Sequence, residues 1–316
     1  MPVIEVANLR KAYGETVAVD DVSFTVDEGE IFGIVGRNGA GKTTAVECVA
    51  GLRTPDAGSI TVAGLDPRAD RDRLRRVLGV QLQECRLPEK LRVGEAMWLY
   101  RSFYPDGADP GTLLAGLGLD GMRDTAFEDL SGGQQQRLSI ALALVGDPRI
   151  AVLDELTTGL DPQSRRETWR LIENVRASGV TVVLVSHFMD EVERLCDRLA
   201  VLDRGRLVAL DTPAGLVERV GGEQRITFRC AQELDEPALR ALPEVDSASS
   251  DGRQWTIIGS GNLLYAVSAE LARQRITPAG FRAEQASLDD AFLALTGRSL
   301  DGDTGVTEVD QRGEVR

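Results

Sequence analysis

A glycine-rich run early in the chain restricts the possible folds more than any other feature of the sequence. The run reads GRNGAGKT over Gly36–Thr43 and lies between a short apolar stretch, Glu30–Val35, and a helical pattern, Lys42–Ala50. This order of strand, loop and helix is typical of a phosphate-binding loop, whose glycines let backbone N–H groups turn toward phosphate oxygens. The lysine can reach the β- and γ-phosphates, and the Thr43 hydroxyl can ligate Mg²⁺. A chance glycine-rich turn is disfavoured, because the whole pattern matches in the correct context.

Two later apolar runs predict that this loop belongs to a parallel α/β sheet. Ile150–Leu153 and Val180–Val185 are continuous apolar segments, as expected for strands buried on both faces. The chain begins with two more predicted strands, Val3–Leu9 and Ala18–Val26. From about Arg92 to Val145 the patterns are mainly helical.

Side chains suited to phosphate chemistry follow these strands. Asp154 and Glu155 end the first run, where one carboxylate can hold Mg²⁺ through a water and the next can polarise an attacking water. His187, the only histidine, follows the second run. A lone histidine is more often structural, but ligands of open α/β sheets bind at strand ends. A role for His187 at the γ-phosphate is therefore favoured.

A second glycine-rich turn, LSGGQ over Leu130–Gln134, opens a second predicted helix. It indicates another phosphate cradle, and the chain has one copy of each. Two other side chains are ambiguous alone. Tyr13 is either a packing residue or a platform that stacks on a purine, and Gln83, by itself, reads as a surface residue.

Composition excludes several classes of protein. The net charge of −14 argues against nonspecific nucleic-acid binding and against docking on anionic lipid through a polybasic patch. No apolar run approaches the roughly 20 residues that span a bilayer, so no direct membrane insertion is expected. The start, Met1–Glu5, does not resemble a secretory signal. The cysteines Cys48, Cys85, Cys196 and Cys230 have no paired spacing and suit reduced thiols.

Over roughly its first 215 residues the chain resembles the ATP-binding-cassette (ABC) ATPases. The resemblance covers seven elements in order: Tyr13 as the A-loop aromatic, Gly36–Thr43 as Walker A, Gln83 as the Q-loop glutamine, Leu130–Gln134 as the signature, Ile150–Glu155 as Walker B, Gly159–Pro162 as the D-loop and His187 as the switch histidine.

The resemblance implies an α/β fold for residues 1–215, with a parallel-sheet core, an antiparallel β subdomain and an α-helical subdomain at about 84–147. It also implies two substrates or cofactors, ATP and Mg²⁺. The catalytic residues would be Glu155 as general base, with His187, Gln83 and Lys42. The metal would be held by Thr43, Gln83 and Asp154. ATP would be contacted by Tyr13, Gly36, Arg37, Asn38, Gly39, Ala40, Gly41, Lys42, Thr43 and Thr44, and by Ser131, Gly133, Gln134 and Asp161, of which Ser131 and Gly133 serve the ATP of a facing protomer.

Two positions depart from the usual family pattern. Leu156 stands where many members have proline, which restores a backbone N–H and frees φ, so the turn into Thr157–Asp161 is expected to be looser. Arg37 stands where relatives often have proline or serine, which adds a cation beside the phosphate path.

After Gly221-Gly222 the predicted order is strand, helix, strand, strand, helix, strand, which suggests a small α+β ferredoxin-like domain over residues 222–298. Ser287–Leu293 and Leu295–Arg298 resemble the accessory domain of daunorubicin/doxorubicin-resistance export ATPases. A packing or dimer-stabilising role is favoured over ligand sensing, because the region has no titratable cluster or glycine loop. Residues 299–316 are polar and acidic, and disorder is expected.

The resemblance therefore implies the ATPase subunit of an exporter of drug-like or lipophilic substrates. Such a subunit works as a homodimer around two ATP molecules, bound to a separate transmembrane permease at the cytoplasmic face of the cell membrane. Import is the nearest alternative. Ribosome-acting ABC proteins usually have two cassettes and a charged linker. Chromosome-organising ATPases place a long coiled coil between the P-loop and the signature, and no heptads are found between Thr43 and Ser131.

Overall fold

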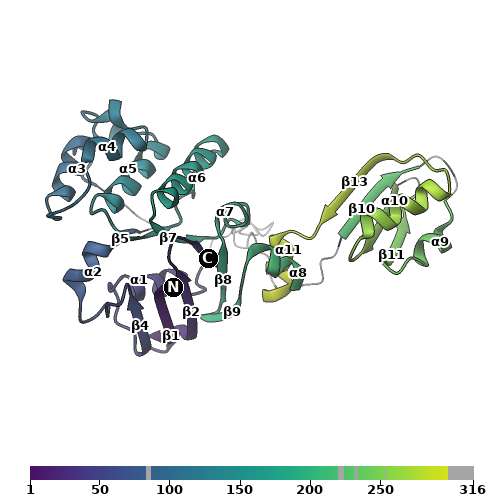
Figure 1. The fold of residues 1–316 in the computed structure, drawn as a ribbon, viewed down its shortest axis with the longest axis horizontal. Coiled ribbons are helices and arrows are strands. Elements are labelled where there is room, and N and C mark those ends of the chain that lie inside the picture. The colour runs from purple at the N-terminus through teal and green to yellow at the C-terminus, as the bar shows by residue number, and fades with distance from the viewer. Residues whose placement is uncertain (83–86, 220–223, 231, 233, 253, 298–316) are drawn as a thin grey trace, which may run out of the picture. The chain divides into compact units, whose positions relative to one another are not determined.

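The computed structural model describes residues 1–82, 87–219, 224–230, 232, 234–252 and 254–297. The chain divides into two compact units, Met1–Pro213 and Ala214–Arg316 (Figure 1). Each unit has a hydrophobic core of its own. The predictions for Gln83, Cys85 and the tail 299–316 lie outside the described residues.

A six-stranded sheet forms the centre of the first unit. Its order is β5-β6-β7-β3-β8-β9, and all neighbours are parallel except β8 and β9, which form an antiparallel hairpin. Strands β6, β7 and β3 are buried along their whole length, which explains their continuous apolar sequences. The strands are β3 (Ile31–Val35), β5 (Leu78–Gln81), β6 (Ile150–Asp154), β7 (Thr181–Ser186), β8 (Arg198–Asp203) and β9 (Arg206–Asp211).

The parallel register brings the carboxyl ends of these middle strands to one edge of the sheet. Val35 at the end of β3 pairs with Ser186 at the end of β7, and Asp154 at the end of β6 pairs with Val185. The residues that follow each strand therefore emerge side by side, which is where open α/β sheets bind ligands.

A second, antiparallel sheet contributes to the same core. Its order is β2-β1-β4, formed by β1 (Pro2–Tyr13), β2 (Thr16–Asp27) and β4 (Ala57–Val62). Helix α1 (Lys42–Val49) buries its apolar side chains in the core that joins this sheet to β3 and β6. The end of β1 consequently carries Tyr13 to the neighbourhood of α1.

Helices make up the rest of the first unit. Three of them, α3, α4 and α5, lie together in Figure 1 and come from the segment that the sequence predicts to be helical. Local signals in the sequence start several helices: Pro110 follows the N-cap Asp109 of α4, and Pro162 follows the N-cap Asp161 of α6. The helices are α2 (Arg71–Val77), α3 (Val93–Arg101), α4 (Pro110–Gly116), α5 (Gly132–Leu144), α6 (Pro162–Ala177) and α7 (Met189–Leu195), with 3₁₀ turns at Asp120–Met122 and Phe127–Asp129.

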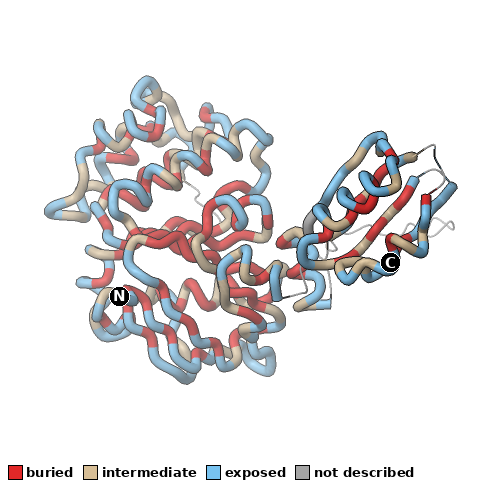
Figure 2. Tube along the Cα trace, turned by 45° about the vertical axis from the view of Figure 1, so that its right-hand side comes forward, coloured by how far each residue is buried: buried red, intermediate tan, exposed pale blue. Residues whose placement is uncertain are grey.

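The second unit has the predicted order of strand, helix, strand, strand, helix, strand, and its antiparallel sheet has the order β11-β12-β10-β13. Burial alternates along β10 and β12, so one face of the sheet packs against α9 and α10 and the other is only partly covered (Figure 2). The elements are α8 (Pro213–Arg219), β10 (Gln224–Arg229), α9 (Glu236–Arg240), β11 (Val245–Ser250), β12 (Gln254–Gly259), α10 (Leu263–Arg273), β13 (Ala279–Gln285) and α11 (Leu288–Thr296).

Helix α11 begins and ends where its sequence indicates. Ser287 and Asp290 form a capping box, in which each side chain accepts a hydrogen bond from the other residue's backbone N–H. Gly297 closes the helix in the left-handed conformation, with φ of 70°. Among the described residues, no helix is both long enough and apolar enough to cross a membrane.

Phe228 provides a test of the second core. Its ring is 1% exposed and stacks on Phe281, with 5.9 Å between ring centroids. We expect Phe228→Ala to lower the free energy of unfolding of the second unit by about 3–5 kcal/mol, because the truncation leaves a cavity. Denaturant unfolding, followed by the fluorescence of Trp255 in a chain with its other two tryptophans replaced by Phe, measures this change. The exposed Tyr265→Ala is the control, and an equal effect of both variants would contradict the assigned core.

Candidate functional site

A pocket of about 450 Å³ opens at the edge of the sheet where β3 ends. It joins the glycine-rich loop to the end of β1 and to the acid that follows β6. Its lining contains most of the residues predicted to contact ATP, together with Glu155 and with Ala18, which was not predicted. The lining residues are Tyr13, Ala18, Arg37, Asn38, Gly39, Ala40, Gly41, Lys42, Thr43, Thr44 and Glu155.

The loop from Gly36 to Gly41 packs so closely that side chains would not fit at its ends. A Cβ on Gly41 would lie 2.3 Å from the Ala18 carbonyl oxygen, and the φ of Gly41 is +97°. A Cβ on Gly36 would lie 2.3 Å from the Leu202 carbonyl oxygen. The loop is therefore fixed between β2 and β8, and the N-terminus of α1 opens into the pocket, where its backbone N–H groups favour an anion.

Lys42, the first residue of α1, connects this loop to the acid after β6. Its Nζ donates hydrogen bonds to the carbonyl oxygens of Gly36 at 2.7 Å and Arg37 at 3.2 Å. The same atom lies 3.7 Å from Glu155 Oε1. The side chain is only 4% exposed, and burial lowers its pKa, although Glu155 and Asp154 both favour the charged form.

Asp154 ends β6 with a carboxylate that is fully buried. Neither carboxylate oxygen has a hydrogen-bond partner of good geometry in the described part of the chain. Burial, together with the charge of Glu155, raises the pKa of Asp154 to about 6, although Lys42 and the neighbouring Thr43 hydroxyl oppose the shift. A buried carboxylate with open acceptor sites beside a threonine hydroxyl fits the oxygen-ligand preference of Mg²⁺.

Glu155 has an unusual backbone conformation that directs its side chain into the pocket. Its φ is +49°, and its N–H donates to the Val185 carbonyl oxygen at 2.9 Å. Its Oε1 lies 3.4 Å from Nδ1 of His187. Contact with His187 lowers the pKa of Glu155 against the effect of burial, and the charge of Lys42 lowers it further. The group is thus ionised at neutral pH and able to accept a proton.

The residue after Glu155 differs from the family pattern. Leu156 is fully buried, and the turn that follows is closed by hydrogen bonds from Thr158 N–H to the Glu155 carbonyl at 3.4 Å and from Leu160 N–H to the Thr157 carbonyl at 3.2 Å. Leucine at this position therefore fills the core beneath the acid pair.

Tyr13 stands at the rim of the pocket with 42% of its surface exposed. Lys11 Nζ and the Arg53 guanidinium lie 5.6 and 5.5 Å from its ring centroid. The sequence reading missed both cations. Neither was readable from the sequence, because the predicted strand ends at Leu9 and the observed strand has a register shift between Lys11 and Ala12. Arg53 reaches the ring only through tertiary packing.

A buried glutamine was also missed. Gln81, the last residue of β5, is 5% exposed, and its Oε1 accepts a hydrogen bond from the Asp154 backbone N–H at 3.0 Å. It extends the β5–β6 pairing by one residue and so fixes the backbone that carries the buried carboxylate. A polar residue at the end of a buried strand is the signal that could have identified it.

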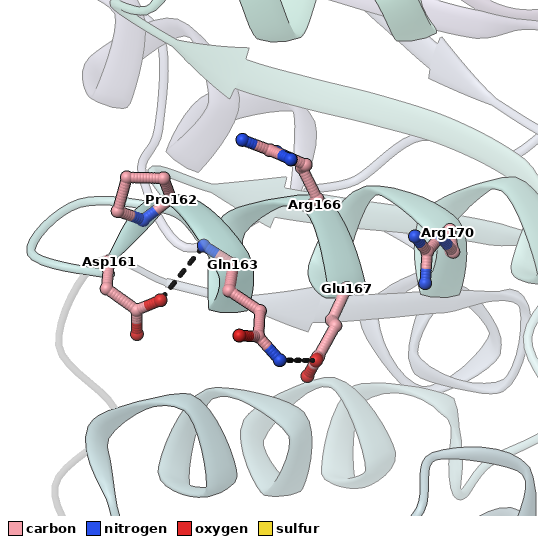
Figure 3. A pocket seen from close by; sticks show the side chains of 6 residues that line it. All are labelled: Asp161, Pro162, Gln163, Arg166, Glu167 and Arg170. Atoms are coloured by element: carbon pink, nitrogen blue, oxygen red, sulfur yellow. Dashed lines mark hydrogen bonds between the residues drawn. The ribbon is translucent and has the colours of Figure 1, made fainter.

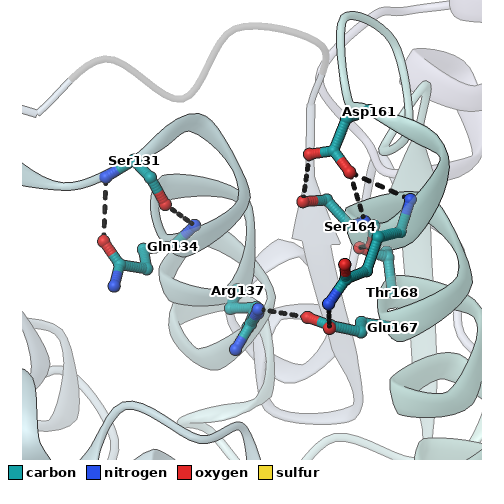
Figure 4. A network of polar contacts seen from close by, with 8 residues as sticks. Ser131, Gln134, Arg137, Asp161, Ser164, Glu167 and Thr168 are labelled. Atoms are coloured by element: carbon teal, nitrogen blue, oxygen red, sulfur yellow. Dashed lines mark hydrogen bonds and ion pairs between the residues drawn. The ribbon is translucent and has the colours of Figure 1, made fainter.

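The signature and D-loop residues lie outside this pocket and act as helix caps (Figure 4). Ser131 Oγ accepts a hydrogen bond from Gln134 N–H at 3.3 Å, and Gln134 Oε1 accepts one from Ser131 N–H at 2.8 Å. The carboxylate of Asp161 accepts hydrogen bonds from the backbone N–H groups of Gln163 and Ser164. The chain therefore does not bring Ser131, Gly133, Gln134 or Asp161 to its own glycine-rich loop.

A second pocket, of about 540 Å³, lies along the N-terminal half of α6 (Figure 3). It shares no lining residue with the first pocket. Its wall comes from one stretch of chain, in which Gln163 Nε2 donates a hydrogen bond to Glu167 at 3.1 Å. Glu167 is also paired with Arg137, which belongs to α5 and does not line the pocket, at 2.7 Å. The lining residues are Asp161, Pro162, Gln163, Arg166, Glu167 and Arg170.

Comparisons with known proteins show which family this chain resembles. A family model described as "ABC transporter" matches residues 19–158. The Nod factor export ATP-binding protein I of Burkholderia lata is 37% identical over 311 residues, covering 95% of this chain and 99% of the relative. The protein of the same name from Rhizobium meliloti is 38% identical over 307 residues, covering 94% and 89%.

Solved structures show the same fold. An ATP-binding subunit of an ABC transporter superposes with a TM-score of 0.63 at 27% identity, covering 69% of this chain and 93% of that one. A dimeric ATP-binding cassette in a post-hydrolysis state, bound to ADP and Pi, gives a TM-score of 0.60 at 25% identity, covering 66% and 98%.

The buried carboxylate of Asp154 makes stability depend on pH. Because its pKa is about 6 in the folded chain against the usual 3.8, the folded state binds the extra proton between these values, and its stability falls as pH rises through this window. We expect Asp154→Asn to raise the free energy of unfolding by about 1–3 kcal/mol at pH 8, without nucleotide and in a chelator.

The gain should shrink as pH falls through 6 and vanish near pH 4, where the wild-type carboxyl is protonated. Denaturant unfolding of both chains across this range measures the difference. A difference that does not change with pH would show that the carboxyl is not held neutral by burial.

Proposed function

Because this chain belongs to the family of ABC transporter ATP-binding subunits, we propose that it powers an exporter whose membrane-spanning part is a separate permease. As an ABC ATPase it hydrolyses ATP for transport. The observation that carries the proposal is one pocket lined by the glycine-rich loop, Lys42 and Glu155, with Glu155 in contact with both Lys42 and His187 and preceded by the buried Asp154.

The pocket accounts for ATP binding in three parts. The exposed ring of Tyr13 would stack on adenine, and the cations beside it would sit near the sugar and phosphates. The loop from Gly36 and the N-terminus of α1 would receive the phosphates, with Arg37, Asn38, Ala40 and Thr44 lining the path. Lys42 would exchange its bonds to loop carbonyls for phosphate oxygens.

The metal ligands proposed are Thr43, Asp154 and Gln83. When bound, Mg²⁺ would neutralise charge on the β- and γ-phosphates. The buried carboxylate of Asp154 supports this assignment, because its oxygens have no partner of good geometry among the described residues and because burial disfavours its ionised form unless a cation binds it.

Glu155 is the proposed general base. Its carboxylate lies between Lys42 and His187, and its pKa is lowered, so it is ionised and can accept the proton of a water that attacks the γ-phosphate. Movement of the Lys42 ammonium onto phosphate would loosen its pairing with Glu155 and free the carboxylate for that water. His187 would contact the γ-phosphate from the end of β7.

The remaining half of each site is proposed to come from a second copy of the chain. Ser131, Gly133, Gln134 and Asp161 lie outside the pocket formed by their own chain, which is the arrangement expected when two copies close head to tail over two ATP molecules. The similar cassette solved with ADP and Pi is described as dimeric. We assign residues 1–215 to this nucleotide-binding domain.

Residues 222–298 are proposed to form a ferredoxin-like accessory domain, supported by its element order and by a sheet in which β10 and β12 are central. The sequence motif of α11 resembles that of drug-export ATPases, and the relatives are named for export of Nod factor. Together these favour export of a lipophilic or drug-like molecule, with the chain held by its permease at the cytoplasmic face of the membrane and without nucleic acid.

We predict that Glu155→Gln lowers ATP turnover at least about 100-fold while leaving ATP binding within threefold, because it removes the base but keeps the shape of the side chain. Turnover by phosphate release, and affinity with a fluorescent ATP analogue, measure the two effects. The same variant should accumulate an ATP-dependent dimer in light scattering. Asp72→Asn, an exposed carboxylate on α2, is the control. Turnover above a tenth of wild type would remove Glu155 from this role.

Direction of transport is tested by co-expressing the chain with a membrane-spanning protein that co-purifies with it from membranes. We expect cells with the wild-type pair to accumulate less doxorubicin than cells with the Glu155→Gln pair, measured by drug fluorescence. Equal accumulation in both would contradict export of this drug class, and higher accumulation with the wild-type pair would indicate import.

A further inference from the structure

A buried carboxylate outside the ATP pocket is hydrogen-bonded to the residue that precedes His187. Glu191, in the first turn of α7, is fully buried. Its Oε2 accepts a hydrogen bond from Ser186 Oγ at 2.5 Å, and its Oε1 accepts one from the indole Nε1–H of Trp169 at 3.0 Å. Both oxygens are therefore committed, each to a different structural element.

The first of these bonds fixes the turn that carries His187. Ser186 Oγ, which donates to Glu191, also accepts a hydrogen bond from Phe188 N–H at 3.0 Å. His187 thus lies between Ser186 and Phe188, which are joined by the Ser186 hydroxyl. Its ring also lies against the Phe188 ring, with 4.1 Å between centroids.

The second bond reaches the helix that starts at the D-loop. Trp169 belongs to α6, whose N-cap is Asp161. One turn earlier in α6, the Arg165 guanidinium lies over the Phe188 ring at 4.2 Å. Two contacts therefore connect the first turns of α6 to the residues around His187.

Burying this carboxylate is costly. Burial raises the pKa of Glu191, and the hydrogen bonds from Ser186 and Trp169, together with the nearby Thr157 hydroxyl and the charge of Arg165, oppose the shift only in part. An apolar side chain of similar volume at such a position is often neutral or stabilising, so stability alone does not explain a carboxylate here.

We propose that Glu191 is a positioning residue that fixes His187 relative to the helix beginning at Asp161, so that the residue at the γ-phosphate and the segment facing the second copy move together. The inference rests on the role proposed for His187. It adds a residue that does not touch ATP and acts through His187.

The test compares Glu191→Gln with Glu193→Gln, an exposed carboxylate on the same helix. Glutamine keeps the volume but cannot accept from Trp169 and Ser186 with both ends at once. We expect Glu191→Gln to lower kcat at least tenfold with the KM for ATP within threefold, and Glu193→Gln to leave both unchanged. Unchanged kcat in Glu191→Gln would overturn the proposal, because the link would then have no effect on the reaction.

A double-mutant cycle separates positioning from a general loss of structure. If Glu191 acts through His187, adding Glu191→Gln to His187→Ala should lower turnover of radiolabelled ATP by less than twofold more. Defects that multiply would contradict the proposal.

Ser186→Ala tests the same link without altering the carboxylate. This variant should reproduce the loss of kcat even if Glu191→Gln folds poorly. A wild-type kcat in Ser186→Ala would overturn the proposal.

The outcomes distinguish this inference from the proposed function. If Glu155→Gln and His187→Ala both lose turnover while Glu191→Gln and Ser186→Ala do not, only the positioning role is wrong. If His187→Ala keeps full turnover, the role proposed for His187 is wrong and the role of Glu191 falls with it.

Discussion

The buried ammonium of Lys42 is the interaction on which the site depends. It bonds two carbonyl oxygens of the glycine-rich loop and lies 3.7 Å from Glu155, so that one charge joins the loop after β3 to the acid after β6. Both segments must emerge at the same edge of a parallel sheet for this contact to form, and the register of β3, β7 and β6 places them there. Without phosphate, the same charge offsets part of the cost of two adjacent buried acids.

Part of the predicted ATP site lies outside the pocket that the chain forms by itself. In the second glycine-rich turn, Ser131 caps the N-terminus of α5, and Asp161 caps the N-terminus of α6. Each cap fixes the start of its own helix, and the Arg137–Glu167 ion pair links α5 to α6. Glu191 makes a second link from α6, this time to the turn around His187. Its carboxylate accepts buried hydrogen bonds from Trp169 and Ser186.

Much of this arrangement could be predicted because its signals are local. The glycine-rich loop, the buried strands ending in Asp154 and Ser186, and the Ser131 cap are readable from residue type and spacing. Contacts between distant segments were not predictable: Arg53 reaches Tyr13, and Trp169 reaches Glu191, only through tertiary packing. A buried Gln or Glu also looks like a surface residue in a sequence, because its partners are invisible there.

Mixing two inactive variants tests most directly whether the active site is shared between two copies. Lys42→Ala disables the phosphate loop, and Ser131→Arg disables the signature turn, so each chain alone should hydrolyse ATP at background. A one-to-one mixture forms some dimers with one intact site, and we expect about a quarter of wild-type turnover per chain. A mixture no more active than its components, or full activity of Ser131→Arg alone, would contradict a site built from two copies.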